Sequence, residues 1–202
     1  MIRLVALLPS AILIVSCGSG SGAAPATPTA RAVTTAPVTT TARTATPVAG
    51  GTPCATIPAG VPTRTAVLEL ANGGVIRLAL RPDKAPNTVA TFVAKANAHF
   101  YDGLTFHRVV ANFVVQGGDP TGTGSGGGSQ PTELSDLPFC RGSLGIARAG
   151  DIKVSNDSQF YICTGECRFL DGQYTNFGQV LTGQDIANAI AVGDKIKTIR
   201  IE

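Results

Sequence analysis

One arginine and one glutamine lie inside an otherwise largely apolar stretch near the middle of this chain. The stretch spans residues 106–119 and reads FHRVVANFVVQGGD, with Arg108 and Gln116 among aromatic and aliphatic neighbours. A guanidinium is costly to bury without a partner. Arg108 is therefore either a core-strand residue that extends its charged end into solvent, or a functional group that stays charged and presents several donors in one plane.

Strand alternation predicts which of these side chains point the same way. The β-branched and aromatic residues favour two short strands that meet at a turn at Ala111-Asn112. Successive strand residues point to opposite faces. Phe106 and Arg108 should therefore share one face, and Phe113, Val115 and Gly117 another face across the turn. His107 should point away from Arg108, and we interpret it as structural.

The rest of the chain predicts short strands and two helices around this stretch. The first helix should begin near Pro86, and the second should span residues 182–190 with Thr182 as its N-cap. Asn72-Gly73 is a hairpin signal. Strands are predicted over residues 65–70, 75–80, 142–149, 159–163, 177–180 and 196–201. This pattern indicates a mainly β fold with an antiparallel sheet closed on itself, and alone it does not separate a barrel from a sandwich.

Four sequence blocks give the chain a resemblance to the cyclophilin-type peptidyl-prolyl isomerases. They are APNTV-x-x-F from Ala85, YDGLTFHRVV-x-x-FVVQGGDPTGTG from Tyr101, SQFYICT from Ser158, and FLDG-x-x-x-x-FGQV from Phe169. Matching order and rough spacing make this more specific than any single short motif. The resemblance implies a cyclophilin-like fold: an eight-stranded antiparallel closed barrel capped by two α-helices. It also implies catalysis of cis/trans rotation about the bond that precedes proline.

The same resemblance implies the roles of three catalytic residues, Arg108, Gln116 and Phe113. Rotation about a peptide bond meets a barrier of ~18–20 kcal/mol, and uncatalysed X-Pro isomerisation takes tens to hundreds of seconds. A donor at the prolyl nitrogen favours its pyramidal form, so no nucleophile, metal or cofactor is required. Arg108 would supply that donor and Gln116 would hold it in place. This helps only if the twisted state is bound better than the planar state.

The remaining predicted site residues would bind the proline-containing peptide. By resemblance, an apolar slot takes the proline ring, the backbone at residues 147–149 holds the peptide extended, and two aromatic rings line the outer edge. Without the family resemblance, we would interpret Phe113, Val114 and Leu170 as plain core. The substrate-binding residues so assigned are Val114, Ala147, Arg148, Ala149, Gln159, Tyr161, Phe169, Leu170 and Tyr174.

Several of these positions differ from the best-known eukaryotic pattern. The segment 151–157 is longer than the family's Pro-Asn-x-x-Gly loop and unlike it. The arginine is retained, so we expect activity, and we predict weaker inhibition by cyclosporin. The substitutions are Val114 for methionine, Arg148 for asparagine, Tyr161 for phenylalanine, Phe169 for tryptophan and Tyr174 for histidine.

The N-terminal residues predict export and a lipid anchor. A short positive region precedes an apolar run over residues 4–15 that is too short to span a bilayer. Cys17 follows directly, which resembles the lipobox of bacterial lipoproteins and implies cleavage before Cys17 and a diacylglycerol on its sulfur. Residues 1–17 would then be a signal peptide, and the protein would be extracytoplasmic and bound to a bacterial membrane. The alternative is an ordinary secretory signal that contains a cysteine.

Composition divides the rest of the chain into a tether and one domain. Residues 18–53 are nearly all Gly, Ala, Ser, Thr, Pro and Val, which predicts a disordered tether. Residues 54–202 form one domain-sized segment. The net charge is only +3, and no basic run is interleaved with aromatic residues, so a nucleic-acid partner is not expected. No stripe typical of oligomers stands out, and we expect a monomer.

Four cysteines remain in the domain: Cys54, Cys140, Cys163 and Cys167. An even number in an exported domain favours disulfides, and four cysteines allow three pairings. We propose Cys163–Cys167 and Cys54–Cys140, the second tying the start of the domain to its barrel. Free buried thiols are the alternative. A metal site is not expected, because no second pair or histidine lies near the Cys-x-x-x-Cys spacing.

These observations leave two functions open. The first is a lipid-anchored isomerase that accelerates X-Pro isomerisation during the folding of exported proteins. The second is a binding or chaperone module that holds proline-containing segments with little or no turnover. A wall-associated structural lipoprotein rests on the tether alone.

Overall fold

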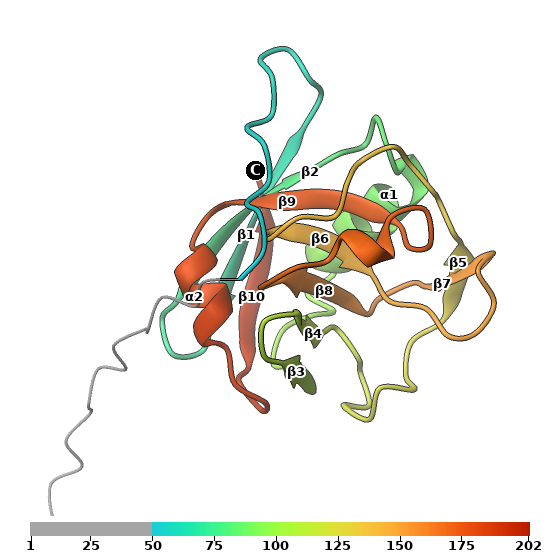
Figure 1. The fold of residues 1–202 in the computed structure, drawn as a ribbon. Coiled ribbons are helices and arrows are strands. Elements are labelled where there is room, and N and C mark those ends of the chain that lie inside the picture. The colour runs from blue at the N-terminus through green and yellow to red at the C-terminus, as the bar shows by residue number, and fades with distance from the viewer. Residues whose placement is uncertain (1–49) are drawn as a thin grey trace, which may run out of the picture. The chain divides into compact units, whose positions relative to one another are not determined.

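The structure is a computed structural model that describes residues 50–202. The predicted signal peptide, the lipidation site Cys17 and residues 18–49 of the predicted tether lie outside the described residues. Figure 1 shows a strongly curled sheet with helical segments at its periphery. Within residues 50–202, no helix combines the length and the apolar character that crossing a bilayer requires.

Ten strands and two α-helices make up the described part of the chain. The strands are β1 (Arg64–Leu70), β2 (Val75–Leu80), β3 (Arg108–Val110), β4 (Val114–Gly117), β5 (Ser129–Pro131), β6 (Ser143–Ile146), β7 (Val154–Asn156), β8 (Phe160–Cys163), β9 (Asn176–Thr182) and β10 (Ile196–Ile201). The helices are α1 (Pro86–Asn97) and α2 (Gln184–Ala189), and η1 (Arg168–Leu170) is a single 3-10 turn.

The hairpin signal at Asn72-Gly73 is confirmed. Gly73 has a φ of 88°, a conformation that glycine adopts without steric cost. The side-chain oxygen of Asn72 accepts a hydrogen bond from the amide of Gly74 at 3.0 Å. The two strands pair in antiparallel register from Arg64–Leu80 to Glu69–Val75.

The two helices begin differently. Pro86 is at the start of α1, as predicted, and the carboxylate of Glu133 accepts hydrogen bonds from the amides of Asn87 at 3.0 Å and Thr88 at 2.7 Å. Helix α2 is shorter than predicted. Its N-cap is Gly183, with a φ of 87° and no side-chain hydrogen bond, so the predicted cap Thr182 is wrong. Thr182 instead ends β9, where it pairs with Arg77.

Eight strands form one antiparallel sheet in the order β10-β1-β2-β9-β6-β8-β4-β3. The predicted strand number and direction are confirmed, but the predicted full closure of the barrel is wrong. The edge strands β10 and β3 do not pair within the described residues. The irregular segment before β3 instead meets the start of β10 and the turn before it. The contacts include a hydrogen bond of 2.8 Å from the amide of Ile196 to the carbonyl of Leu104, a Thr105–Lys195 bridge and a hydrogen bond of 2.9 Å from the amide of Phe106 to the carbonyl of Asp194. Strand β3 has three residues, too few to extend the ladder across this gap.

A second, two-stranded sheet was not predicted. Strands β5 and β7 pair over three residues each. Segments this short cannot show the alternation from which a strand is recognised.

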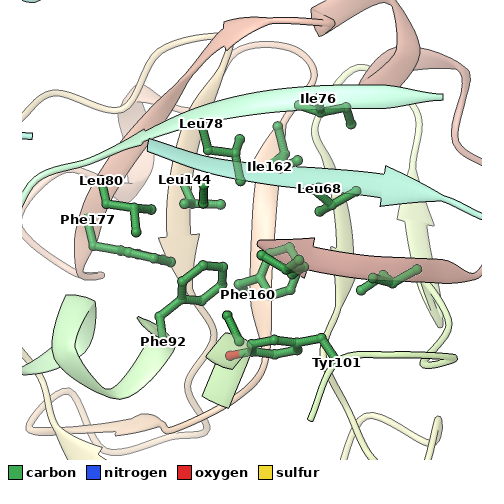
Figure 2. Packing of buried hydrophobic residues seen from close by; sticks show 14 of the residues in the cluster. Leu68, Ile76, Leu78, Leu80, Phe92, Tyr101, Leu144, Phe160, Ile162 and Phe177 are labelled. Atoms are coloured by element: carbon green, nitrogen blue, oxygen red, sulfur yellow. The ribbon is translucent and has the colours of Figure 1, made fainter. Parts of the chain in front are cut away.

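The main apolar core fills the inside of the curled sheet (Figure 2). Alternate residues of β1 and β2 supply one side of it, and Phe92 of α1 and Tyr101 close another. Phe160 lies at its centre, with ring centroids 5.6 Å from Phe92 and 5.7 Å from Tyr101. The inward residues of β1 and β2 are Ala66, Leu68, Leu70, Ile76, Leu78 and Leu80.

A second, smaller apolar cluster lies on the outer face of β4, β6 and β8, and we call it the pocket cluster. Strand alternation separates the two clusters, because Phe160 and Ile162 enter the core while Tyr161 and Cys163 point the other way. The pocket cluster consists of Val114, Phe139, Tyr161, Cys163, Cys167 and Leu170, with Phe113, Ala147 and Tyr174 packed against it.

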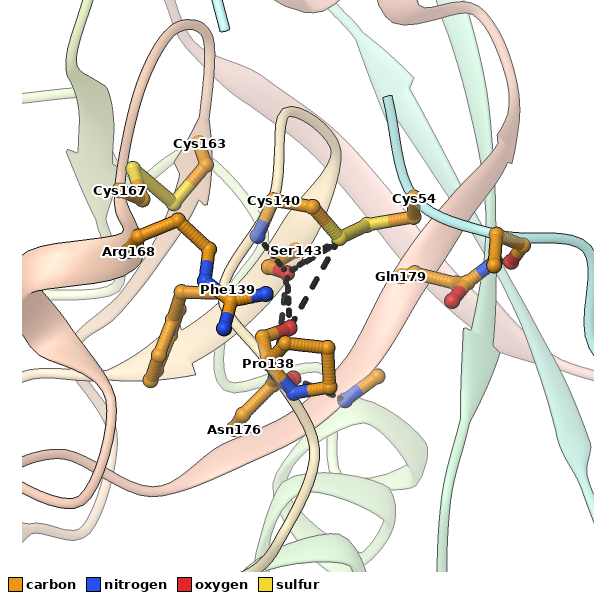
Figure 3. Close-up of a disulfide and its surroundings, with 12 residues drawn as sticks. Cys54, Pro138, Phe139, Cys140, Ser143, Cys163, Cys167, Arg168, Asn176 and Gln179 are labelled. Atoms are coloured by element: carbon orange, nitrogen blue, oxygen red, sulfur yellow. Dashed lines mark hydrogen bonds between the residues drawn. A yellow bond between two sulfur atoms is a disulfide. The ribbon is translucent and has the colours of Figure 1, made fainter. Parts of the chain in front are cut away.

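Both predicted cysteine pairs are disulfides in the structure (Figure 3). The Cα atoms of Cys54 and Cys140 are 5.1 Å apart, and those of Cys163 and Cys167 are 6.5 Å apart. The hydroxyl of Ser143 lies 3.4 Å from the sulfur of Cys54 and 3.2 Å from that of Cys140. The alternative of four free thiols is therefore wrong.

The domain begins slightly earlier than predicted. The carbonyl of Thr52 accepts a hydrogen bond from the amide of Arg141 at 2.8 Å, and Pro53 forms a β-bridge with the same residue. We predicted that these two residues belong to the tether. The bridge lies next to the Cys54–Cys140 disulfide, and local composition does not reveal this proximity of distant residues.

Candidate active site

The side chain of Arg108 is the first member of a row of hydrogen-bonded side chains. The row runs from β3 across β4 to the residue that precedes β8. Arg108 on β3 is opposite Gln116 on β4, and its Nη1 donates to the side-chain oxygen of Gln116 at 3.3 Å. The nitrogen of the same Gln116 amide donates to the side-chain oxygen of Gln159 at 3.0 Å. Gln116 therefore holds the guanidinium from one side and leaves its other donors free for a ligand.

Gln159, which directly precedes β8, fixes the orientation of both side-chain amides in this row. Its side chain is buried, with 2% of the residue exposed, and its nitrogen donates to the carbonyls of Gly124 at 3.0 Å and Gly126 at 2.8 Å. Its oxygen is then the only end that can face Gln116, so Gln116 must present its own oxygen to Arg108. The positions of these groups are set before any ligand arrives.

The glycine-rich loop that receives Gln159 is organised by Asp119. The carboxylate accepts hydrogen bonds from the amide and hydroxyl of Thr121, at 2.8 and 2.9 Å, and from the amide of Gly124. Burial alone would raise the pKa of Asp119, but these hydrogen bonds outweigh burial and lower its pKa to about 2. A Cβ at Gly126 would overlap the same carboxylate, so the loop requires glycine there.

A pocket of about 260 Å³ opens beside Arg108. Its deep walls are formed by Val114, Tyr161 and Leu170, whose side chains are largely apolar. These residues are 2%, 4% and 6% exposed, so they lie at the bottom of the pocket. The full lining is Arg108, Phe113, Val114, Gln116, Ala147, Arg148, Tyr161, Leu170 and Tyr174, all of them predicted site residues.

The rim of the pocket is aromatic. Phe169, which is 59% exposed, packs against Phe113 with ring centroids 5.1 Å apart. The guanidinium carbon of Arg108 lies 5.9 Å from the centroid of the Phe113 ring. On the other side, Tyr174 stands edge-on to Tyr161 at 6.2 Å. Phe169 and Tyr174 thus lie at the edge, where we predicted them.

A larger groove of about 560 Å³ adjoins the pocket and shares Gln116, Ala147 and Arg148 with it. The two remaining predicted site residues, Ala149 and Gln159, line this groove. The glycine-rich loop and strand β7 form its other walls. Eleven of the twelve predicted catalytic and substrate-binding residues therefore line two connected cavities, and the twelfth, Phe169, packs against Phe113 at the rim.

Three details differ from the predictions. Phe106 and Arg108 do not share a face, because Phe106 precedes β3 and is buried in the main core, whereas Arg108 is exposed and lines the pocket. Phe113 does not share a face with Val115, because it precedes β4 and follows Asn112, whose φ is 58°. Strand alternation does not apply across that turn, and Phe113 instead lines the pocket beside Val114. Phe139 was not predicted. It is 1% exposed and stacks on Tyr161 at 6.1 Å, and its irregular segment offers no pattern from which to identify it.

The histidine that neighbours Arg108 has no place in the pocket. His107 is half-buried, and burial lowers its pKa. It does not line either cavity, in agreement with its structural interpretation. Residues 50–202 also contain no group of three or more His, Cys, Asp or Glu side chains that could hold a metal ion.

Chemically, the site offers a charged, positioned donor beside an apolar slot, and among residues 50–202 the pocket lining includes no Ser, Thr, Cys, Lys, Asp or Glu side chain. Such an arrangement can bind an apolar ring and donate to an atom next to it. The antiparallel strand order, the apolar pocket and the hydrogen bonds that link Arg108, Gln116 and Gln159 together define a cyclophilin-like protein.

Comparison with known proteins extends this definition. The profile of the family "Cyclophilin type peptidyl-prolyl cis-trans isomerase/CLD" matches residues 65–202. A peptidyl-prolyl cis-trans isomerase of Synechococcus elongatus is 43% identical over 140 residues, which cover 67% of this chain and 94% of the relative. Peptidyl-prolyl cis-trans isomerase B of Bacillus subtilis is 42% identical, over 69% of this chain and 99% of the relative.

A solved structure is also similar. It is a cyclophilin-type peptidyl-prolyl isomerase of Cryptosporidium parvum, determined in the presence of the dipeptide Ala-Pro. The TM-score is 0.62 at 26% identity, and the match covers 68% of this chain and 98% of that one. The present chain belongs to the cyclophilin-type peptidyl-prolyl cis-trans isomerase family.

Proposed function

We propose that this protein accelerates X-Pro isomerisation in exported proteins, with Arg108 as the residue that donates to the prolyl nitrogen. The observation that carries the proposal is the position of the Arg108 guanidinium, held by Gln116 at the mouth of an apolar pocket. A donor that is already in place loses little entropy when it meets the twisted amide.

The apolar walls of the pocket favour proline as the group that enters it. The compact, apolar ring of proline suits walls formed by Val114, Tyr161 and Leu170. The adjoining groove supports an extended peptide rather than a free amino acid, since it continues from the pocket past Ala147 and Arg148. The structure of the Cryptosporidium parvum relative was determined in the presence of the dipeptide Ala-Pro, which is consistent with such a ligand.

The compartment is a separate part of the proposal. The leader that ends at Cys17 and the two disulfides of the domain favour an oxidising, extracytoplasmic location with a lipid anchor. Mass spectrometry of the mature N-terminus tests it. A diacylated Cys17 as first residue is expected, and a mature chain that retains residues 1–16 or carries an unmodified Cys17 would contradict it.

Catalysis is tested by replacing Arg108. We expect Arg108→Ala to lower kcat/KM for a proline-containing peptide by about 100- to 1,000-fold, the usual effect of removing one preorganised donor. The thermal midpoint should hardly change, because Arg108 is exposed. The measurement is the rate of cis/trans exchange together with proline-limited refolding of a model protein.

The matched control is Arg64→Ala, which removes the same charge from an exposed position on β1. Its rate should equal that of the wild type. A wild-type protein that binds proline peptides without accelerating either reaction would contradict the enzyme and favour the binding module.

A further inference from the structure

The side chain of Arg148 is fixed at the junction of the pocket and the groove. Its Nε donates to the carbonyl of Gln173 at 3.0 Å, and its Nη1 donates to the carbonyls of Ala149 at 2.9 Å and Gly150 at 3.1 Å. The guanidinium carbon also lies 4.5 Å above the ring centroid of Tyr174. These contacts restrict the side chain in advance, so a ligand that meets it orders little that is still mobile.

Its charge is not neutralised by a neighbour. Arg77, Arg81, Arg168 and Arg200 each form an ion pair, but within residues 50–202 neither Arg148 nor Arg108 has a carboxylate within 4.0 Å. Asp151 lines the groove but makes no ion pair with Arg148. A bound peptide therefore meets two guanidinium groups that have no ion-pair partner within residues 50–202, around one pocket of about 260 Å³.

One end of the Arg148 side chain remains available. Nη2 donates to no other group in the described part of the chain, whereas Nε and Nη1 are occupied by backbone carbonyls. A carboxylate is the partner that a planar guanidinium binds best. In an extended peptide, successive residues are spaced ~3.3–3.6 Å apart. The side chain next to a proline seated in the pocket is then well within the ~8–10 Å over which charges interact in physiological salt.

From these contacts we propose that Arg148 is a specificity-determining residue that favours substrates with an acidic residue next to the proline. The inference rests on the proposed function and names its substrate class. Because Arg148 is half-buried rather than enclosed, the preference should have the size of a solvent-screened ion pair. We expect kcat/KM for a glutamate peptide to exceed that of the matched glutamine peptide by about two- to five-fold.

The experiment measures how fast the mature protein isomerises two sets of proline-containing peptides. Within a set, the residue next to proline is Glu, Gln or Lys, and the two sets place it before or after the proline. In at least one set the wild type should rank Glu above Gln above Lys. The ratio of Glu to Lys should shrink towards one at about 1 M salt, where the screening length is ~3 Å.

Three variants test whether Arg148, rather than the overall charge of the protein, causes the preference for Glu peptides. Arg148→Gln should lose most of the Glu-to-Gln ratio, whatever its absolute rate. Arg148→Lys should keep part of the ratio, because the charge remains while the planar fork is lost. Arg64→Gln removes one positive charge from an exposed site outside both cavities and should keep the full ratio. Thermal melts of each variant report folding.

The outcomes distinguish this inference from the function on which it rests. Turnover of the Gln peptides without any preference for Glu in either set overturns the role of Arg148 and leaves the isomerase intact. An equal loss of preference in Arg64→Gln also overturns it, because net charge would then be the cause. No turnover of any of the peptides overturns the proposed function and this inference together. If a variant at position 148 fails to fold, the wild type can still overturn the inference, because a preference for Glu that is absent or that does not shrink in salt contradicts it.

Discussion

The main core and the pocket cluster occupy opposite faces of β4 and β8, yet they are stabilised differently. In the core, Val115, Phe160 and Ile162 are at most 1% exposed and are covered by other side chains. The pocket cluster has a similar apolar composition, but one side of it opens into a cavity of about 260 Å³. A core can be closed completely, whereas a binding site must keep a surface uncovered.

Other interactions compensate for that open side. The Cys163–Cys167 disulfide links β8 to the turn before η1, which supplies Phe169 and Leu170. The carboxylate of Asp171 accepts a hydrogen bond from the amide of Phe139 at 2.6 Å and holds the segment behind Tyr161. Apolar burial therefore stabilises the core, while cross-links and side-chain hydrogen bonds shape the pocket.

Replacing phenylalanine by alanine should mainly lower stability in the core and mainly weaken peptide binding in the pocket cluster. Phe160→Ala removes a ring that contacts Phe92, Tyr101 and Phe106, and should lower the free energy of unfolding by about 3–5 kcal/mol. Phe113→Ala removes a partly exposed ring, and should cost about 1 kcal/mol or less while raising KM at least several-fold. Urea unfolding and peptide exchange rates measure the pair. Equal losses of stability would contradict the division into a closed core and an open wall.

Removing the cross-link tests whether the pocket wall depends on it. A Cys163→Ser/Cys167→Ser variant should lose about 2 kcal/mol of stability, the chain-entropy value for a loop this short. It should also raise KM, because η1 is then less constrained. Steady-state kinetics and urea unfolding of the oxidised protein measure both effects. A variant that unfolds more easily but binds peptide unchanged would show that the wall is positioned without the disulfide.

Acid should loosen the glycine-rich loop before it affects the core. The folded-state pKa of Asp119 is about 2, below the ordinary value of 3.8. A lowered pKa stabilises the fold above pH ~4, and the contribution is lost as pH falls from about 4 towards 2. The expected loss is about 1–2 kcal/mol. Chemical denaturation between pH 5 and pH 2 measures it, and Asp119→Asn should be less stable at neutral pH but lack this part of the acid dependence.

A small gain of stability is expected within the pocket cluster. The hydroxyl of Tyr161 is buried and has no hydrogen-bond partner within residues 50–202, and burial raises its pKa, with Tyr174 adding to the rise. Leaving a buried hydroxyl unpaired costs about 1–3 kcal/mol. Tyr161→Phe should therefore raise the free energy of unfolding by about 1 kcal/mol. A lower thermal midpoint would indicate that the hydroxyl binds an ordered water.

Gly145 explains how a tyrosine fits at this position. Gly145 and Tyr161 are opposite each other on β6 and β8, and a Cβ at position 145 would overlap the end of the tyrosine ring. Neither residue alone indicates this relation in the sequence. Their proximity follows from the strand register.

Much of the site could nevertheless be predicted. Arg108, Gln116 and Phe113 lie in one continuous motif, and the family resemblance assigned the other positions one by one. Phe139 could not be identified, because its segment has neither strand periodicity nor a motif. Thr182 was misassigned as a cap because a helix N-cap and a strand end favour the same residue type.

Alternation, turn residues and motifs act over short stretches of chain, so they were enough to predict most of the strands, the family and most of the residues around the pocket. The tertiary structure was needed to show that the sheet stays open between β3 and β10 and that Thr52 already belongs to the domain. It also decided that Arg148 lies uncompensated between two cavities. The physical reason is that register, ion pairing and cavity shape depend on residues far apart in the chain, which are neighbours only after folding.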